Sequence, residues 1–362
     1  MKLVNGWYKT GIITKQETNV LKGIAILCII LHNLCHNIAG TIQENEFCFE
    51  ISNSYAFAGV MPNGEHLFAN FFSYFGHFTV GLFVFCTGYG LTISMQNTSH
   101  NGSGNGFWSF MLKRMKKMWA LMISALLCYI MVSGSLCYVF HIIDYFPFRF
   151  QELFVLTFLH NLVYPVKTNF FFGPWWYWGV AFQLILIYRL CVYRRRLHWI
   201  VTITVLSLLL GIGLSDSDLP VTWLYYYKHN AVGWIMPFAL GVIMARKNII
   251  VTPVVSLFAI VLLAFSCINE YLWHFSQLFA VLVILGLLPF FKLEAFNRGF
   301  LKIGEMSMFI FASHTIVKRW VQPHIDFDNL YVVMPIYLVM VWCMACLCKF
   351  VRDKFVSKAI KA

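Results

Sequence analysis

The stretch LKGIAILCIILHNLCHNI, residues 21–38, decides the class to which this protein belongs. A helix needs about 20 mostly apolar residues to cross the hydrocarbon core of a membrane, and Lys22 is the only Lys, Arg, Asp or Glu in this stretch. The stretch therefore predicts a membrane-spanning helix. It also places two histidines, His32 and His36, where lipid or other helices must surround them.

The composition extends this prediction to the whole chain. Of the 362 residues, 60% are hydrophobic and 12% are charged, and the mean hydropathy is +0.70. Soluble domains are about 45–50% apolar and about 25% charged, so a water-soluble globule, a disordered chain and a fibrous repeat are excluded. The 27 Lys and Arg residues exceed the 15 Asp and Glu residues. We attribute this excess to cytoplasmic loops rather than to a nucleic-acid site.

We predict an all-α polytopic membrane protein, a bundle of about ten transmembrane helices. The predicted spans are residues 21–38, 68–95, 118–141, 175–192, 197–214, 231–245, 251–267, 275–291, 300–320 and 330–348. Spans of about 20 residues use most of such a chain, so any chemistry must lie among the helices or at their ends. No internal repeat or domain boundary is visible, and residues 1–362 are predicted to form a single membrane-embedded domain.

The loop charges predict the orientation of the bundle. Segment 113–117 holds four basic residues, whereas loop 39–67 holds four Glu and no Lys or Arg. Since basic residues mark the cytoplasmic side, we predict that both termini are cytoplasmic. The sides alternate only if the weakly apolar segment 150–166 does not cross, so we predict a non-crossing helix there, at the outer face. Lys318 and Arg319 fall on the outer side and do not follow the charge pattern.

His32 is the best candidate for a functional residue, because an ionisable side chain inside a membrane span is costly and rarely retained without a role. It follows Lys22 by ten residues, which is about 15 Å along a helix, on an overlapping face. A neutral imidazole can accept a proton, as a general base must. The alternative is that His32 only hydrogen-bonds to Asn33 or to a neighbouring helix.

His36 lies one turn beyond His32, a spacing that metal sites also use. No third ligand with matching spacing is evident, and no partner ligands lie near the cysteine cluster Cys343, Cys346 and Cys348. We therefore predict no metal site. Packing or contact with a substrate is the expected role of His36.

Five motifs, in the same order along the chain, make the sequence resemble the acyltransferase-3 family of integral membrane acyltransferases. The motifs are Leu21-Lys22-Gly23-Ile24-Ala25 leading to His32, the aromatic run from Gly76-His77 to Thr87-Gly88-Tyr89, the basic run from Lys113-Arg114 to Lys116-Lys117, Gly173-Pro174-Trp175-Trp176-Tyr177, and Gly304-Glu305-Met306-Ser307 leading to His314. The sequence departs from the family pattern in three places: the proline usual near the basic run is absent, where Trp119 and Ala120 stand, and two matched positions differ. Thr87 replaces the usual Ser, and Lys117 stands in the second place of an Arg-x-x-Arg pair, where it cannot make the bidentate contact of Arg.

The resemblance implies an O-acetyltransferase-like enzyme. Such an enzyme moves an acyl group, usually acetyl, from cytosolic acyl-CoA to a hydroxyl of a cell-surface carbohydrate or envelope precursor. It implies His32 as the catalytic residue, acting either as a base or as an acyl carrier. Acyl-CoA is then a donor substrate rather than a permanently bound cofactor, and the expected location is the bacterial cytoplasmic membrane.

The other candidate residues divide by the side of the membrane. Three cations are expected to bind the phosphates of acyl-CoA: Lys22, Arg114 and Lys117. Four further residues are expected to bind or orient the acceptor: His314, Trp176, Tyr177 and His36. For the cations the alternative is ordinary topology-setting charge, for the aromatic residues an interfacial belt, and for His314 a hydrogen-bonded core position.

Two other functional classes compete with the enzyme. A multispan transporter or flippase of an envelope precursor would also bury ionisable residues, but such proteins commonly show internal repeats and paired helix breaks. Neither is visible here. A structural partner in an envelope-synthesis complex would leave His32 without a chemical role.

Overall fold

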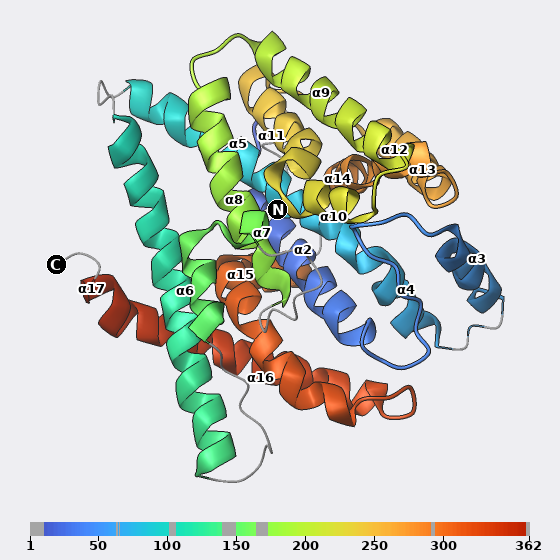
Figure 1. Cartoon of the computed structure of the whole chain (residues 1–362), viewed down its shortest axis with the longest axis vertical. Coiled ribbons are helices and arrows are strands. Elements are labelled where there is room, and N and C mark those ends of the chain that lie inside the picture. Colours follow the sequence, from blue (N-terminus) through green and yellow to red (C-terminus); the bar gives the residue numbers. More distant parts are fainter. Residues whose placement is uncertain are drawn as a thin grey trace.

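The computed structural model describes residues 11–62, 64, 66–100, 106–139, 150–163, 173–290 and 294–359, and within these residues the chain is helical and contains no strand (Figure 1). The longer helices are α2 (Lys15–Cys35), α3 (Ile51–Val60), α4 (Leu67–Phe75), α5 (Val80–His100), α6 (Phe107–Tyr138), α8 (Trp176–Ile187), α9 (Leu197–Ser215), α10 (Thr222–His229), α11 (Ile235–Lys247), α12 (Pro253–Ser266), α14 (Ser276–Leu287), α15 (Glu294–Val321) and α16 (Leu330–Val351). Shorter pieces join them: η1 (Gly76–Thr79), η2 (Phe150–Thr157), α7 (His160–Val163), η3 (Gly173–Trp175), η4 (Tyr188–Val192), η5 (Ala231–Trp234), α13 (Glu270–Trp273), η6 (Leu288–Phe290), η7 (Gln322–His324), η8 (Arg352–Val356) and α17 (Ser357–Ala359).

The predicted all-α polytopic class is confirmed. In the described part of the chain, seven helical segments are long and apolar enough to cross a membrane. They are Lys15–Cys35, Leu67–Asn97, Phe107–Tyr138, Gly173–Val192, Leu197–Ser215, Asn297–His324 and Leu330–Val356. The other three predicted spans coincide with α11, α12 and α14, which have 13, 14 and 12 residues. Helices of that length rise only about 20 Å, so the count of ten and the orientation of the termini stay predictions.

The segment predicted as one non-crossing helix near 150–166 is broken into two short pieces, η2 and α7. The break lies at Phe158, whose φ of 61° is left-handed and cannot continue a helix. The Phe158 ring instead stacks on Trp119 of α6 and on Phe182 of α8, with centroid distances of 5.9 and 5.1 Å. Neither piece alone is long enough to span a membrane, and residues 164–166 lie outside the described part.

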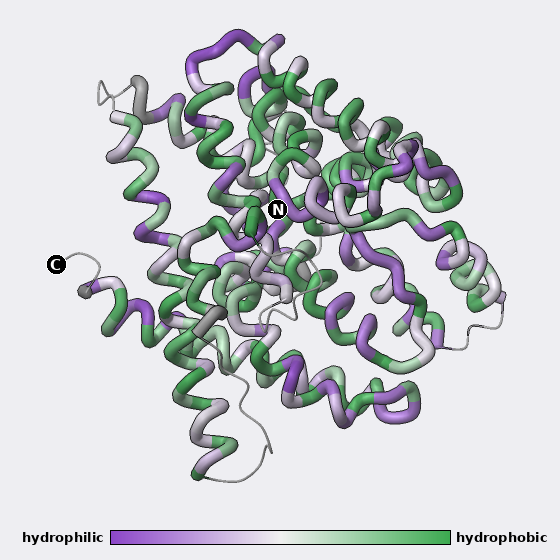
Figure 2. Tube along the Cα trace, viewed as in Figure 1, coloured by the Kyte–Doolittle hydropathy of each residue, from purple (hydrophilic) through white to green (hydrophobic). Residues whose placement is uncertain are grey.

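The outward faces of several helices are apolar, as lipid contact requires. Along α9 and α12 the chain is hydrophobic over most of its length (Figure 2). Leu206 of α9 and Phe258 of α12 are 61% and 67% exposed. Soluble proteins rarely expose continuous apolar surface of this extent, so these helices are suited to a bilayer rather than to water.

Helices α2 and α15 pack against each other at the centre of the bundle (Figure 1). Two glycines, Gly23 of α2 and Gly304 of α15, allow this close approach. A Cβ built on Gly23 would collide with the backbone oxygen of Phe300, and one built on Gly304 would collide with that of Asn19. Small residues at such contacts are the usual device by which membrane helices bring their backbones together. The pair fixes the position of His32 relative to α15.

Replacing Gly304 with Ala should therefore destabilise the bundle. We expect the loss that overpacking usually causes, about 1–3 kcal/mol, seen as a lower thermal unfolding midpoint in detergent. Gly213→Ala on α9 is the matched control, since a Cβ there meets nothing within 4 Å. Equal midpoints for the two variants would contradict the packing of α2 on α15.

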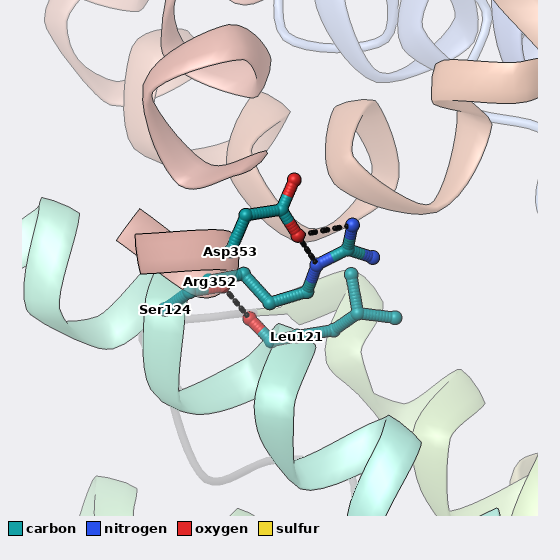
Figure 3. A network of polar contacts seen from close by, with 4 residues as sticks. All are labelled: Leu121, Ser124, Arg352 and Asp353. Atoms are coloured by element: carbon teal, nitrogen blue, oxygen red, sulfur yellow. Dashed lines mark hydrogen bonds and ion pairs between the residues drawn. The ribbon is translucent and has the colours of Figure 1, made fainter. Parts of the chain in front are cut away.

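The start of η8 is anchored beside α15. The Arg352 guanidinium donates to the Asp353 carboxylate from Nε at 2.8 Å and lies 2.6 Å from it at Nη2, and it lies 4.4 Å from the centroid of the Phe309 ring of α15. The Ser124 hydroxyl of α6 donates to the carbonyl of Leu121 at 2.7 Å (Figure 3). The Arg352 charge is thus neutralised by a neighbour rather than left facing the apolar core.

Candidate active site

A cavity of about 410 Å³ lies at the C-terminal end of α2. Its walls come from α2, η1, α5, α7, η3, α8, α10 and α15, and from the loop that follows α2. Its volume is within the range of small-molecule sites. Five histidines lie on its wall: His32, His36, His77, His160 and His229. The cavity therefore collects side chains from segments spread over most of the chain.

The His32 ring is held by the backbone of α4. Its Nδ1 lies 3.2 Å from the carbonyl oxygen of Phe72. A carbonyl oxygen only accepts hydrogen bonds, so Nδ1 carries the ring proton, and in the neutral ring Nε2 keeps its lone pair. The ring is 8% exposed and lies on the cavity wall. Nε2 of His32 is thus prepared to take a proton or to act as a nucleophile.

Gly76 allows η1 to approach His32 this closely. A Cβ at position 76 would lie 2.6 Å from the His32 Cβ and 2.8 Å from the Cys28 carbonyl oxygen. The second motif of the sequence begins with this glycine, and its role here is to leave room for the backbone of α2 and the Cβ of His32.

His36 is oriented in the same way one turn farther along. Its Nδ1 lies 3.2 Å from the hydroxyl of Ser73, which itself donates to the carbonyl of Ile42. Because the hydroxyl proton is used on Ile42, the His36 Nδ1–H donates to the Ser73 oxygen. The His32 ring lies 4.9 Å from that of His36 and 5.4 Å from that of His77, centroid to centroid. The three rings form a polar strip along one side of the cavity.

Aromatic rings form another part of the cavity wall. Phe47, in the loop after α2, stacks on His229 of α10 with a centroid distance of 3.8 Å and an angle of 15°. Trp176 of α8 meets the Phe47 ring edge-on at 5.5 Å. Flat aromatic surfaces of this kind suit the apolar face of a ring-shaped ligand.

The position of this wall is set by one amide. Asn161 of α7 donates from Nδ2 to the carbonyls of Trp176 and His229, at 2.7 and 2.6 Å. It thereby links α7, α8 and α10. Gln183 and Asn230 continue the network, with a hydrogen bond of 2.8 Å from the Gln183 amide to the Asn230 oxygen. Hydrogen-bond networks of this kind fix the positions of short helices, which have little apolar surface of their own to pack.

The loop that carries Phe47 is anchored by a buried acid, Glu44. Glu44 is 2% exposed and accepts a 2.8 Å hydrogen bond from Asn53. Burial raises its pKa to about 7, although the Asn53 and Trp273 side chains partly oppose the shift. Burial also raises the pKa of Glu46 to about 7, and the nearby ammonium of Lys228 opposes it. Near neutral pH these carboxyls sit close to their midpoint of ionisation.

Replacing Glu44 with Gln should make stability less dependent on pH. Because the folded-state pKa of about 7 exceeds the usual 4.5, the wild type should lose stability as pH rises from about 4.5 through 7, when the buried carboxyl must ionise. Gln cannot ionise, so Glu44→Gln should not lose stability in this way. The unfolding midpoint of the variant, relative to that of the wild type, should therefore rise as the pH rises across this window. Exposed Glu305→Gln is the control. A difference that does not change with pH would contradict the account.

The structure brings together only part of the predicted site. His32, His36, Trp176 and Tyr177 all lie on the cavity wall. His314 is fully buried, with its Nδ1 2.8 Å from the Phe311 carbonyl, and it lies behind the wall rather than on it. Its proposed contact with the acceptor stays a prediction that the geometry does not support directly.

The three predicted donor-binding cations lie away from the cavity. Lys22 is partly exposed near the N-terminal end of α2, and its charge reaches Cys86 of α5. Arg114 of α6 stacks over the Phe110 ring at 3.8 Å, and Lys117 is exposed one turn farther along. None of the three lines the cavity, and their binding of the donor phosphates stays a prediction.

Sequence reasoning missed Phe47, His229 and Glu46. Their cavity positions follow from the fold of a loop and a short helix. Their only sequence signal is polar and aromatic residues clustered next to weak spans. Among the described residues, no group of three or more His, Cys, Asp or Glu side chains is arranged to hold a metal ion.

A family model described as an acyltransferase domain matches residues 16–349. The chain belongs to the acyltransferase-3 family. The match covers the helices that form the cavity, from α2 through α15, and it confirms the resemblance seen in the five motifs. No curated protein and no solved structure matches the chain. The protein is therefore a multi-pass membrane acyltransferase of this family.

Proposed function

We propose that the protein transfers an acyl group, acetyl by preference, from acyl-CoA to a hydroxyl of a cell-surface carbohydrate or envelope precursor. His32 is the catalytic base of this proposal, and the bacterial cytoplasmic membrane is its setting. The observation that carries the proposal is the orientation of His32. Its Nδ1–H is committed to the Phe72 carbonyl, and its Nε2 is free for chemistry in a cavity that can hold a sugar-sized ligand.

The reaction uses His32 as both base and acid. Nε2 removes the proton of the acceptor hydroxyl while the oxygen attacks the thioester carbonyl. The tetrahedral intermediate collapses with cleavage of the carbon–sulfur bond. The departing thiolate takes the proton from the imidazolium, so CoA leaves as a thiol and His32 returns to its starting form. A route through an acyl-histidine would use the same Nε2 as nucleophile.

The two substrates are proposed to reach His32 from opposite ends of α2. Lys22 precedes His32 by ten residues, about 15 Å along the helix. With Arg114 and Lys117 it would bind the phosphates of acyl-CoA, and the pantetheine arm would run inward from there. The acceptor would enter the cavity next to Phe47, Trp176 and Tyr177.

The experiment that tests the proposal supplies purified protein in lipid nanodiscs with [14C]acetyl-CoA and an extract of envelope glycan. We expect CoA release and labelled acetyl ester on the glycan, removable by mild alkali. A transporter or flippase would consume no acetyl-CoA. Absence of both CoA release and ester, with folded protein in the nanodisc, would overturn the proposal. Mass spectrometry of the labelled product identifies the acceptor.

A further inference from the structure

Lys318 is the one Lys or Arg side chain on the described cavity wall. It lies on α15 with Met308 and Phe311, which also line the cavity. Phe311 and Lys318 follow Met308 by three and ten residues, so all three side chains share one face of the helix. The seven residues from Phe311 to Lys318 rise about 10 Å. The ammonium group is therefore carried to the same end of the cavity as His36, whose imidazole feels its charge.

No carboxylate of the described residues is paired with Lys318, and Glu46 is the one carboxylate on the cavity wall. The cation that acts on Glu46 is Lys228, whose ammonium also lies 4.1 Å from the centre of the Trp273 ring. The histidines around Lys318 cannot supply negative charge. Lys318 lies in the last turn of α15 and is partly buried, so its ammonium group loses part of its hydration, a cost that a bound anion would offset.

We propose that Lys318 binds an anionic group of the acceptor, a carboxylate or a phosphate. This inference rests on the proposed acyl transfer and adds a class of acceptor to it. The sugar ring lies against Trp176 and Phe47, its hydroxyl points toward His32, and its acidic group reaches Lys318 about one turn of α2 farther along. The ligand supplies the counter-charge that no described side chain of the cavity gives to Lys318.

The test compares acceptors that differ in charge alone. Wild-type protein in phosphatidylcholine nanodiscs is given [14C]acetyl-CoA and either the methyl glycoside of glucuronic acid or its neutral carboxamide. The methyl glycoside of glucose 6-phosphate provides the phosphate arm. A hydrogen bond to a charged group is worth enough to change affinity roughly 10- to 100-fold. We expect a preference of that size in kcat/KM for an acid over the amide.

Lys318→Gln should bring this preference close to one, and Lys318→Arg should keep most of it. Lys302→Gln removes an exposed cation from the same helix, outside the cavity, and should keep the wild-type preference. A wild type that treats acid and amide alike would overturn the proposal. An equal fall of both rates in Lys318→Gln would also overturn it, because it would assign the ammonium to the tetrahedral oxyanion instead.

A binding measurement separates this proposal from the proposed function. The thermal unfolding midpoint of each variant is recorded with the glucuronide, the 6-phosphate and the amide, at constant ionic strength without acetyl-CoA, since a bound ligand raises it. An acid-specific rise that Lys318→Gln removes, without any acetyl transfer, would keep the anion site and reject the acyltransferase. Acetyl transfer that does not distinguish the acid from the amide would keep the proposed acyltransferase function and reject the anion site. If the midpoint rises only when the nanodisc contains phosphatidylglycerol, and not with the glucuronide or the 6-phosphate, Lys318 is assigned to the lipid surface and the anion site is rejected.

Discussion

Replacing His32 with Ala is expected to lower the rate of acyl transfer roughly 100- to 10,000-fold, the usual contribution of a general base. The loss should appear in kcat, since alanine removes the group that takes the proton of the acceptor hydroxyl in the transition state. The KM for acetyl-CoA should change little, because donor phosphates are proposed to bind at the other end of α2. The measurement is steady-state CoA release by protein in nanodiscs.

Two matched variants control this prediction. His198→Ala removes an exposed histidine of α9 outside the cavity and should behave as the wild type. His36→Ala removes the neighbouring imidazole, which is oriented by Ser73, and should cost less than His32→Ala. Transfer by His32→Ala within a few-fold of the wild type, at equal protein abundance, would remove His32 from the chemistry.

The second large effect is expected for Lys22→Ala. Loss of a charged contact to phosphate costs about 1.5–3 kcal/mol, so the KM for acetyl-CoA should rise roughly 10- to 100-fold while kcat changes little. Lys113→Ala, which removes an exposed lysine of α6, is the control for a general loss of basic charge. A fall in kcat alone, or the same KM in both variants, would show that Lys22 does not bind the donor.

Most of the fold could be predicted from hydropathy, because only a helix satisfies its own backbone hydrogen bonds within lipid. All ten predicted spans coincide with helices of the structure. The breaks could not be predicted in the same way. The helix that begins at Leu67 tightens into η1 at Gly76, where a glycine lies against His32, and segment 150–166 breaks at Phe158 because its ring packs between α6 and α8.

The candidate site was predictable where one helix carried the signal. His32 and His36 lie one turn apart on α2, so their shared face followed from sequence spacing. Phe47 and His229 are far apart in the sequence, and their stacking depends on a loop held by Glu44 and on the amide of Asn161. In the sequence, Lys318 stands out only as an exception to the charge pattern. Its place on the cavity wall depends on which face of α15 is turned toward the cavity, and the sequence alone does not give that.

The most direct test of the central claim is a cryo-EM structure of the protein with a thioether analogue of acetyl-CoA, which cannot transfer its acyl group. We expect the acyl carbonyl carbon in the cavity about 3–4 Å from the His32 ring, the spacing of a reactive complex, with the analogue's phosphates beside Lys22. An analogue bound elsewhere, or a protein wall between its carbonyl and His32, would contradict the account.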